Sequence, residues 1–309
     1  MKKTMINRCH VEGIIYEHTL ETAVTGPNSK NPGSEYIRGT LSVATDDAGI
    51  NIVPVYFSYV APKTSKGTDN ATYIVLKNII DGVIGTQMKN GKENAGKVRI
   101  DTSIGVNDFY TDRNGKVELI TAKRNEGGFV HTCDVLAEDE KTRSTFECDM
   151  LITDATRLEA VEDRGIPERV IVKGAVFDFR NTLLPVEFTA TNVNAMNYFE
   201  DLGATSSTPV FTKVWGRQVS EVIVRRTEEE SAFGDAAVRE TKTSRKDFVI
   251  TGAAKEPYIW DDEGTITANE LAQMIAARET YLASVKQRFD ESKNKTATPA
   301  APAQSDFKF

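Results

Sequence analysis

One order of short segments occurs twice along this chain, and this repetition limits the folds that are open to it. The first pair of matching segments, VEGIIYE and VKGAVFD, both place a glycine third, between a charged residue and two apolar ones. In chain order, the matched pairs are residues 11–17 and 172–178, 54–57 and 185–188, 73–80 and 195–202, and 98–105 and 209–216. Four matches in the same order predict a duplication of one small structural unit.

Most of the repeated segments have the character of strands. Residues 10–16, 36–43 and 52–57 are short, rich in β-branched and aromatic residues, and bounded by turn-forming residues. Gly13 suggests a bulge, which lets one strand bend around both sheets of a small barrel. Each copy has three strands, a helix-compatible stretch and two more strands, which is the order of the OB-fold. We therefore predict a mainly all-β protein with two tandem five-stranded OB-fold barrels.

The spacing of the repeat suggests where each barrel begins and ends. Pro54 follows Gly13 by 41 residues and Pro185 follows Gly174 by 11, so the first copy carries a long inserted loop. Residues 145–153 are the predicted closing strand of the first barrel, and residues 246–251 that of the second. The expected domains are residues 1–158 and 159–256.

The pattern changes after the second barrel. Thr267 and Glu270 have the spacing of a capping box, and apolar residues then recur at helical intervals. This predicts an amphipathic helix over residues 265–292, either docked on the second barrel or pairing two protomers. Residues 293–309 have almost no bulky apolar residue before their end and are expected to be a disordered tail.

Composition excludes several classes of function. No run of about 18 apolar residues and no apolar N-terminal segment is present, so we expect a cytoplasmic protein. A net charge of −7 argues against a histone-like protein coated in basic patches. The three cysteines and three histidines lack metal-ligand spacing, and no phosphate-binding loop or nucleophile motif occurs. We therefore expect no metal, no cofactor and no enzymatic activity.

Single-strand binding needs aromatic faces for the bases and cations for the phosphates. In an OB-fold that surface lies on the second and third strands and the neighbouring loops, and the later strands carry further candidates. About half of any aromatic set on a strand faces the core instead. The candidate nucleic-acid-binding residues are Tyr36, Arg38, Tyr56, Tyr59, Lys63, Lys66, Arg99, Tyr110, Lys213, Trp215, Arg217 and Arg225.

The opening of the chain, residues 7–13 (NRCHVEG), resembles that of the single-stranded DNA-binding protein family. The resemblance extends over about residues 6–252, and the layout is similar to that of phage-encoded members with two barrels in one chain. It implies single-stranded DNA as a partner, and replication or recombination proteins as partners of a C-terminal tip containing Asp306, Phe307 and Phe309. The tail lacks the family's acidic run, and the second copy has Pro167-Glu168-Arg169 where the family has Asn-Arg.

Two functions of different classes remain open from the sequence. The first is a non-catalytic protein that coats single-stranded DNA in phage replication or recombination, in the host cytoplasm, with a monomer and a homo-oligomer both open. The alternative is a structural or protein-interaction module, such as a virion or assembly factor, which the acidic net charge favours. The two differ in whether the basic and aromatic residues share one face.

Overall fold

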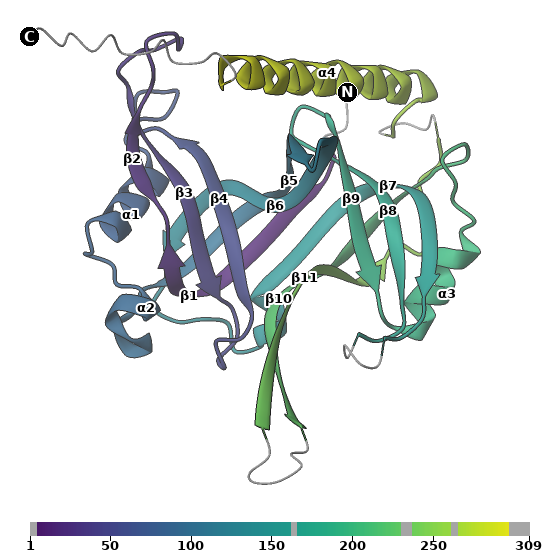
Figure 1. The fold of residues 1–309 in the computed structure, drawn as a ribbon, viewed down its shortest axis with the longest axis horizontal. Coiled ribbons are helices and arrows are strands. Elements are labelled where there is room, and N and C mark those ends of the chain that lie inside the picture. Colours follow the sequence, from purple (N-terminus) through teal and green to yellow (C-terminus); the bar gives the residue numbers. More distant parts are fainter. Residues whose placement is uncertain (1–4, 162–165, 230–236, 261–264, 297–309) are drawn as a thin grey trace, which may run out of the picture.

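The computed structural model describes residues 5–161, 166–229, 237–260 and 265–296, and Figure 1 shows a mainly β molecule with a long C-terminal helix lying across one end. The strands are β1 (Asn7–His18), β2 (Glu21–Val24), β3 (Glu35–Ala44), β4 (Ile52–Val60), β5 (Lys97–Arg113), β6 (Lys116–Thr132), β7 (Ser144–Leu158), β8 (Arg169–Phe177), β9 (Leu183–Ala190), β10 (Val210–Glu229) and β11 (Ala237–Ala253). The helices are α1 (Ala71–Ile80), α2 (Gln87–Asn90), α3 (Val193–Asp201) and α4 (Ala268–Thr296), with short 3-10 turns at Lys92–Asn94 and Glu140–Thr142.

The first barrel is formed by β1, β3, β4, β5 and β6. Antiparallel pairs join β1 to β3, β3 to β4, β5 to β6 and β1 to β5. A short parallel contact between β4 and β6, where Val55 lies opposite Asn125, closes the barrel. The inserted loop contributes an additional edge strand, β2, which pairs with β3.

The second barrel repeats this pairing with β7, β8, β9, β10 and β11. Antiparallel pairs join β7 to β8, β8 to β9, β10 to β11 and β7 to β10. The parallel contact falls between β9 and β11, where Thr189 lies opposite Val249. Each barrel has its helix between the third and fourth strands, and an asparagine side chain caps each helix: Asn70 for α1 and Asn192 for α3. The fold is therefore two OB-type barrels followed by a helix, as the sequence predicts.

The strand pairing shows that the first pair of matching segments in the predicted repeat does not occupy equivalent strands. Gly13 lies on β1, the first strand of its barrel, whereas Gly174 lies on β8, the second strand of the other barrel. The predicted closing strand of the first barrel, residues 145–153, is in β7, which opens the second barrel. β6 closes the first barrel instead. The predicted boundary after Leu158 is therefore one strand too late, because the second barrel begins at Ser144.

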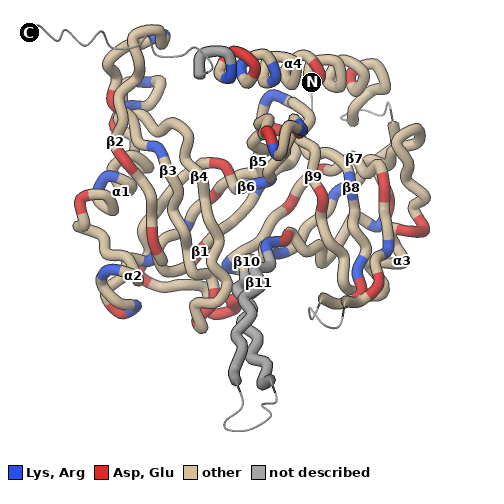
Figure 2. The backbone as a smooth tube through the Cα atoms, viewed as in Figure 1, with Lys and Arg blue, Asp and Glu red and all other residues tan. Residues whose placement is uncertain are grey.

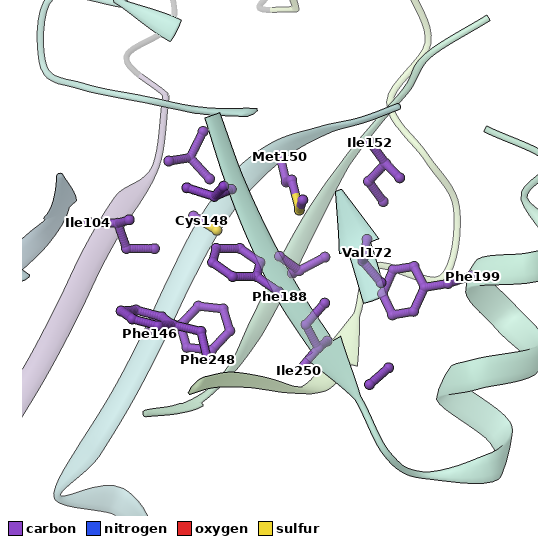
Figure 3. Close-up of a cluster of buried hydrophobic side chains, with 14 of the residues drawn as sticks. Ile104, Phe146, Cys148, Met150, Ile152, Val172, Phe188, Phe199, Phe248 and Ile250 are labelled. Atoms are coloured by element: carbon purple, nitrogen blue, oxygen red, sulfur yellow. The ribbon is translucent and has the colours of Figure 1, made fainter. Parts of the chain in front are cut away.

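The two barrels share one sheet and part of one core. β7 pairs with β1 of the first barrel as well as with β8 and β10. Figure 3 shows the core of the second barrel, where Phe146, Phe188 and Phe248 pack together and Ile104 joins them from β5 of the first barrel. A separate cluster around Leu41, Leu76 and Ile100 fills the first barrel. Burial of such side chains is the main stabilising contribution in both barrels.

The helix α4 contacts both barrels rather than the second alone. The predicted capping box is present: the Glu270 backbone N–H donates to Thr267 Oγ1, and the Thr267 N–H donates to the Glu270 carboxylate. Near this end, Leu271 and Met274 pack on a cluster of Phe177 and Phe211 in the second barrel. Farther along, Arg278 forms a buried ion pair with Asp108 of β5. Of the helices in the described ranges, none has the length and apolar character that a membrane crossing requires.

Candidate nucleic-acid interface

Two rows of outward-facing residues cross the sheet where the barrels join. In one row, pairing places Arg8 of β1 opposite Glu147 of β7, and Glu147 opposite Trp215 of β10. The other row runs through Phe129 on β6, Asp101 on β5, His10 on β1, Thr145 on β7 and Arg217 on β10. The intervening residues Cys9 and Phe146 face inward and are buried, so alternation along each strand aims both rows at solvent.

These rows line a groove of about 1130 Å³, which we call the seam groove. It spans β1, β5, β6, β7, β10 and β11, and its lining combines aromatic, cationic and acidic side chains. Over the molecule as a whole, positive and negative residues are interspersed in the view of Figure 2, so the local lining decides what the groove can bind. The charged and aromatic members of the lining are Arg8, His10, Asp101, Phe129, Lys141, Phe146, Glu147, Trp215 and Arg217.

Two aromatic rings of the seam groove are open to solvent. Phe129 is 70% exposed and Trp215 is 41% exposed. The indole of Trp215 lies against Gly252 of the neighbouring strand β11, since a Cβ at that position would come within 2.4 Å of the ring. Gly252 therefore lets the ring lie over the strand, which leaves its outer face free for stacking.

The cations of the seam groove differ in whether they are neutralised. Among the described residues, Arg8, Lys141 and Arg217 have no ion-pair partner. By contrast, Lys213 pairs with Glu147 of the groove. Three cationic side chains are therefore available to an anionic ligand, and one of the two acids in the groove is already neutralised.

A charged network borders the groove on β1 and β5. His10 Nδ1 lies 3.1 Å from Asp101 Oδ1, and its Nε2 lies 3.2 Å from Glu12 Oε2. Arg99 donates to the same Glu12 oxygen at 3.1 Å. Burial alone would raise the pKa of Glu12, but hydrogen bonds from Arg99, the Ala137 N–H and His10 hold that pKa below its ordinary value. Arg99 therefore stabilises the buried Glu12 carboxylate, and it also lies on the outward face of the sheet.

A second aromatic and cationic surface covers β3 and β4 of the first barrel. Tyr36 and Tyr59 stack with ring centroids 4.7 Å apart, and Tyr59 is 51% exposed. The Arg124 guanidinium of β6 lies 5.6 Å from the Tyr56 ring, and both residues line a cavity of about 430 Å³ together with Arg38. Arg38 itself pairs with Glu21 at 2.7 Å.

The seam groove and the β3–β4 surface meet at β6. Arg124 lines the cavity on β3–β4, and Gly127 and Phe129 line the seam groove. Gly127 also lies beside Tyr56, because a Cβ on this glycine would contact the Tyr56 carbonyl at 3.7 Å. A single ligand strand could therefore pass from one surface to the other along β6.

The structure separates the residues predicted from the sequence into groups. Tyr36, Arg38, Tyr56 and Tyr59 lie together on β3–β4, whereas Lys213, Trp215 and Arg217 lie at the seam. Lys63 pairs with Asp69 at 2.6 Å, and Lys66 is exposed in the same loop.

Three other predictions have different outcomes. Tyr110 is displaced from the candidate surface, because it packs against Phe289 of α4 with ring centroids 6.0 Å apart. Arg225 lies on β10, but its side chain is outside the described residues. The predicted tail at 293–309 is corrected at its start, since α4 extends to Thr296, and the rest, with Asp306, Phe307 and Phe309, is outside the described residues.

Sequence reasoning missed several residues of this surface. Arg8 belongs to the opening motif but was not predicted as a contact, and Phe129, Arg124 and Lys141 were not considered. The strand β6 was not recognised, and it supplies two of these four. A period of two along residues 116–132 is interrupted by the bulge at Gly127, which obscures the signal.

The three cysteines are free thiols, and two of them are buried. Cys9, Cys133 and Cys148 are free, and burial raises the pKa of the Cys9 and Cys148 thiols, which keeps them protonated. In the part of the chain that the structure describes, no cluster of three or more His, Cys, Asp or Glu residues could hold a metal ion.

Comparison with known proteins gives a matching family model and similar solved structures. A family model described as YorF matches residues 6–288. No curated protein matches the chain. A deletion mutant of the single-stranded DNA binding protein from Thermus aquaticus is similar in structure, with 10% sequence identity and a TM-score of 0.45, over 84% of this chain and 97% of that chain. The wild-type protein from the same organism has 10% identity and a TM-score of 0.43, over 82% and 93%.

Proposed function

The chain belongs to the YorF family, and we propose that it is a non-catalytic protein that binds single-stranded DNA along the seam groove and the β3–β4 surface. One observation carries the proposal: the exposed rings of Trp215 and Phe129 lie on the same sheet face as Arg8 and Arg217, whose charges are unpaired among the described residues. Unpaired bases expose faces that can stack on such rings, and the phosphates between them need cations.

Stacking makes this surface selective for single strands. In a duplex the base faces are covered by neighbouring bases, so Trp215 and Phe129 would gain no stacking partner. A sheet face with exposed aromatics binds a flexible strand whose bases can turn toward it. We therefore expect the protein to bind single strands in preference to duplex.

The cellular role follows from the resemblance at the opening of the chain rather than from the geometry. We propose that the protein covers single-stranded DNA during replication or recombination of a phage-type genome, in the host cytoplasm. The OB-type duplication would place two such barrels in one chain, and the C-terminal tip would recruit partner proteins.

The test is fluorescence anisotropy of a labelled dT oligonucleotide of about 30 nucleotides, titrated at low and moderate salt with duplex of the same length as the control. We expect tight binding to the single strand that weakens as salt rises. Absence of binding at low salt, where a cationic groove acts most strongly, would refute the proposal.

Variants at Arg8 and Arg217 sharpen this test. Arg8→Ala and Arg217→Ala should each reduce the slope of log affinity against log salt by about 0.7, the contribution of one phosphate contact on a single strand. Arg180→Ala is the matched control, because this arginine lies over Phe179 outside the groove. An unchanged slope in both groove variants would show that phosphates do not contact these residues.

A second candidate is a protein-interaction module, and one observation favours it. Four of the predicted cations already have acidic partners: Arg38 with Glu21, Lys63 with Asp69, Arg99 with Glu12, and Lys213 with Glu147. A surface of paired charges suits a protein partner with its own interspersed charges. The anisotropy titration separates the two candidates, since this module would not retain the oligonucleotide at low salt.

A further inference from the structure

The helix of each barrel is attached to its last strand differently, and in the second barrel a cavity lies between the helix and that strand. In the first barrel, Thr72 of α1 is bonded directly to β6: its hydroxyl donates to the Gly128 carbonyl at 3.4 Å and accepts from the Val130 N–H at 3.2 Å. In the second barrel, α3 reaches the end of β11 through the Tyr198 hydroxyl, which donates to the Ala254 carbonyl at 3.0 Å.

On its other side, α3 is tied to β7. Arg157 donates from Nε and Nη2 to the Glu200 carboxylate, at 2.9 and 2.6 Å, and from Nη2 to Asn197 Oδ1 at 2.9 Å. Met196 and Phe199 anchor the helix in the core. These contacts fix the position of α3 relative to β7 and to the end of β11.

The cavity between α3 and β11 has a volume of about 780 Å³. Of the described residues that line it, Arg217 and Lys255 are cationic and none is acidic. Asn192, Asn194 and Thr251 add polar groups, and Tyr198 adds an aromatic ring. In a chain of net charge −7, a lining with two cations and no carboxylate favours an anionic ligand.

The cavity is continuous with the seam groove. Arg217 and Thr251 line both. Arg217 is exposed between them, opposite Thr145 on one side and Val249 on the other. A strand that leaves the groove past Arg217 therefore enters the cavity with no acidic side chain in its lining to repel the phosphates.

We propose that the cavity between α3 and β11 is a second subsite for single-stranded nucleic acid, which receives the continuation of a strand held in the seam groove. The inference rests on the proposed function of that groove. It makes the two barrels unequal: the first presents its β3–β4 surface, and the second presents the cavity beside its helix. The volume is within the range of pockets that bury small ligands, which is enough for a few nucleotide groups but not for a duplex.

The experiment compares a short and a long dT oligonucleotide, of about 8 and about 30 nucleotides, because one OB-fold covers about 4–16 nucleotides. The variants are Lys255→Glu and Asn194→Glu, which place a negative charge in the cavity at exposed positions. Glutamate in the first turn of α3 is compatible with the helix, so Asn194→Glu retains the fold. Lys30→Glu, on an exposed loop of the first barrel, is the control with the same charge change as Lys255→Glu.

We expect both cavity variants to lower the advantage of the long oligonucleotide over the short one by about tenfold, which is the scale of one or two lost phosphate contacts. Lys30→Glu should leave this ratio at the wild-type value. If the wild-type protein binds and both cavity variants keep the same ratio of long-oligonucleotide to short-oligonucleotide affinity, the second subsite is refuted and the proposed function of the seam groove is not. If the wild-type protein binds neither oligonucleotide, the proposed function fails first.

Discussion

Under the proposed function, Trp215 is the residue on which single-strand binding should depend most. Its ring lies against the neighbouring Gly252, and the residue is partly exposed to solvent. Trp215→Ala should weaken binding of a dT oligonucleotide by about 1–3 kcal/mol, the contribution of one stacked base. Anisotropy titrations measure the change. The control is Phe179→Ala, which removes an aromatic that is 80% exposed but lies outside the groove.

The fluorescence of Trp215 can also show whether a base contacts its ring. The chain has two tryptophans, and Trp260 is partly buried against Phe211. In a Trp260→Phe variant, the fluorescence therefore comes from Trp215 alone. Quenching by added oligonucleotide would place a base against that ring, whereas binding without any fluorescence change would place the strand elsewhere.

Lys123 shows how a charge at the junction of the barrels depends on pH. Its ammonium lies 5.0 Å from the Phe188 ring and 4.6 Å from the Phe248 ring, and it donates to the Glu187 carbonyl. Burial lowers the pKa of Lys123 to about 8, although Asp247 and Glu187 act in the opposite direction. The unfolded chain has the ordinary lysine pKa, so between about pH 8 and 10.5 it holds a proton that the native state has lost.

The contribution of Lys123 to the free energy of unfolding therefore rises with pH across this window. Below pH 8 this contribution is constant, because Lys123 is protonated in both the native and the unfolded state. Lys123→Met retains the apolar stem without the charge. The free energy of unfolding of both proteins is measured in urea at several pH values from 7.5 to about 10. We expect the difference, wild type minus variant, to increase as pH rises. A difference independent of pH would contradict the lowered pKa, since the other titrating groups cancel in the comparison.

At the scale of elements, a buried ion pair joins α4 to the first barrel, beside the contact of Tyr110 with Phe289. Arg278 Nη1 and Nη2 donate to the two Asp108 oxygens at 2.7 and 2.6 Å, and Thr121 donates to the same carboxylate at 2.7 Å. Removing one partner leaves an uncompensated buried charge. Arg278→Ala should therefore lower the free energy of unfolding by about 3–5 kcal/mol.

The comparison for Arg278→Ala is another ion pair on the same helix. Lys286 pairs with Asp290 at 2.8 Å, and both side chains are about half exposed. Pairs of this spacing contribute about 0.3–0.5 kcal/mol, and the Lys286 ammonium also lies 5.6 Å from the Tyr110 ring. Lys286→Ala should therefore have a small effect in the same urea titration. Equal effects of the two substitutions would show that the Arg278–Asp108 pair does not anchor the helix.

The elements also show what the sequence could predict. Local signals identified β3, β4, the two capped helices and the capping box at Thr267, because turn residues, alternation and caps act within a few positions. The sequence did not reveal that β7 pairs with β1, β8 and β10, because pairing between strands depends on contacts that no local pattern encodes. The seam groove was missed for the same reason. Arg8, Phe129 and Arg217 come together only through this register.

The whole molecule is expected to unfold as one unit, although its pattern suggests two. The sheet runs without interruption through β7 and β1, and α4 contacts both barrels. Cys9 and Ile104 come from strands of the first barrel and are buried in the core of the second. Loss of the second barrel would therefore remove a sheet partner from β1 and expose apolar side chains of the first, which couples the two transitions.

Two probes with different coverage test this coupling in a urea titration. Far-UV circular dichroism follows the strands of both barrels, whereas both tryptophans report on the second barrel and the cluster beside it. We expect coincident midpoints in the wild type. Ile104→Ala should lower the free energy of unfolding by about 2–5 kcal/mol. Ile104 lies on a strand of the first barrel but packs in the core of the second. The midpoints measured by both probes should therefore shift by the same amount. A fluorescence transition that separates from the circular dichroism transition would mean that the barrels unfold independently despite the shared core.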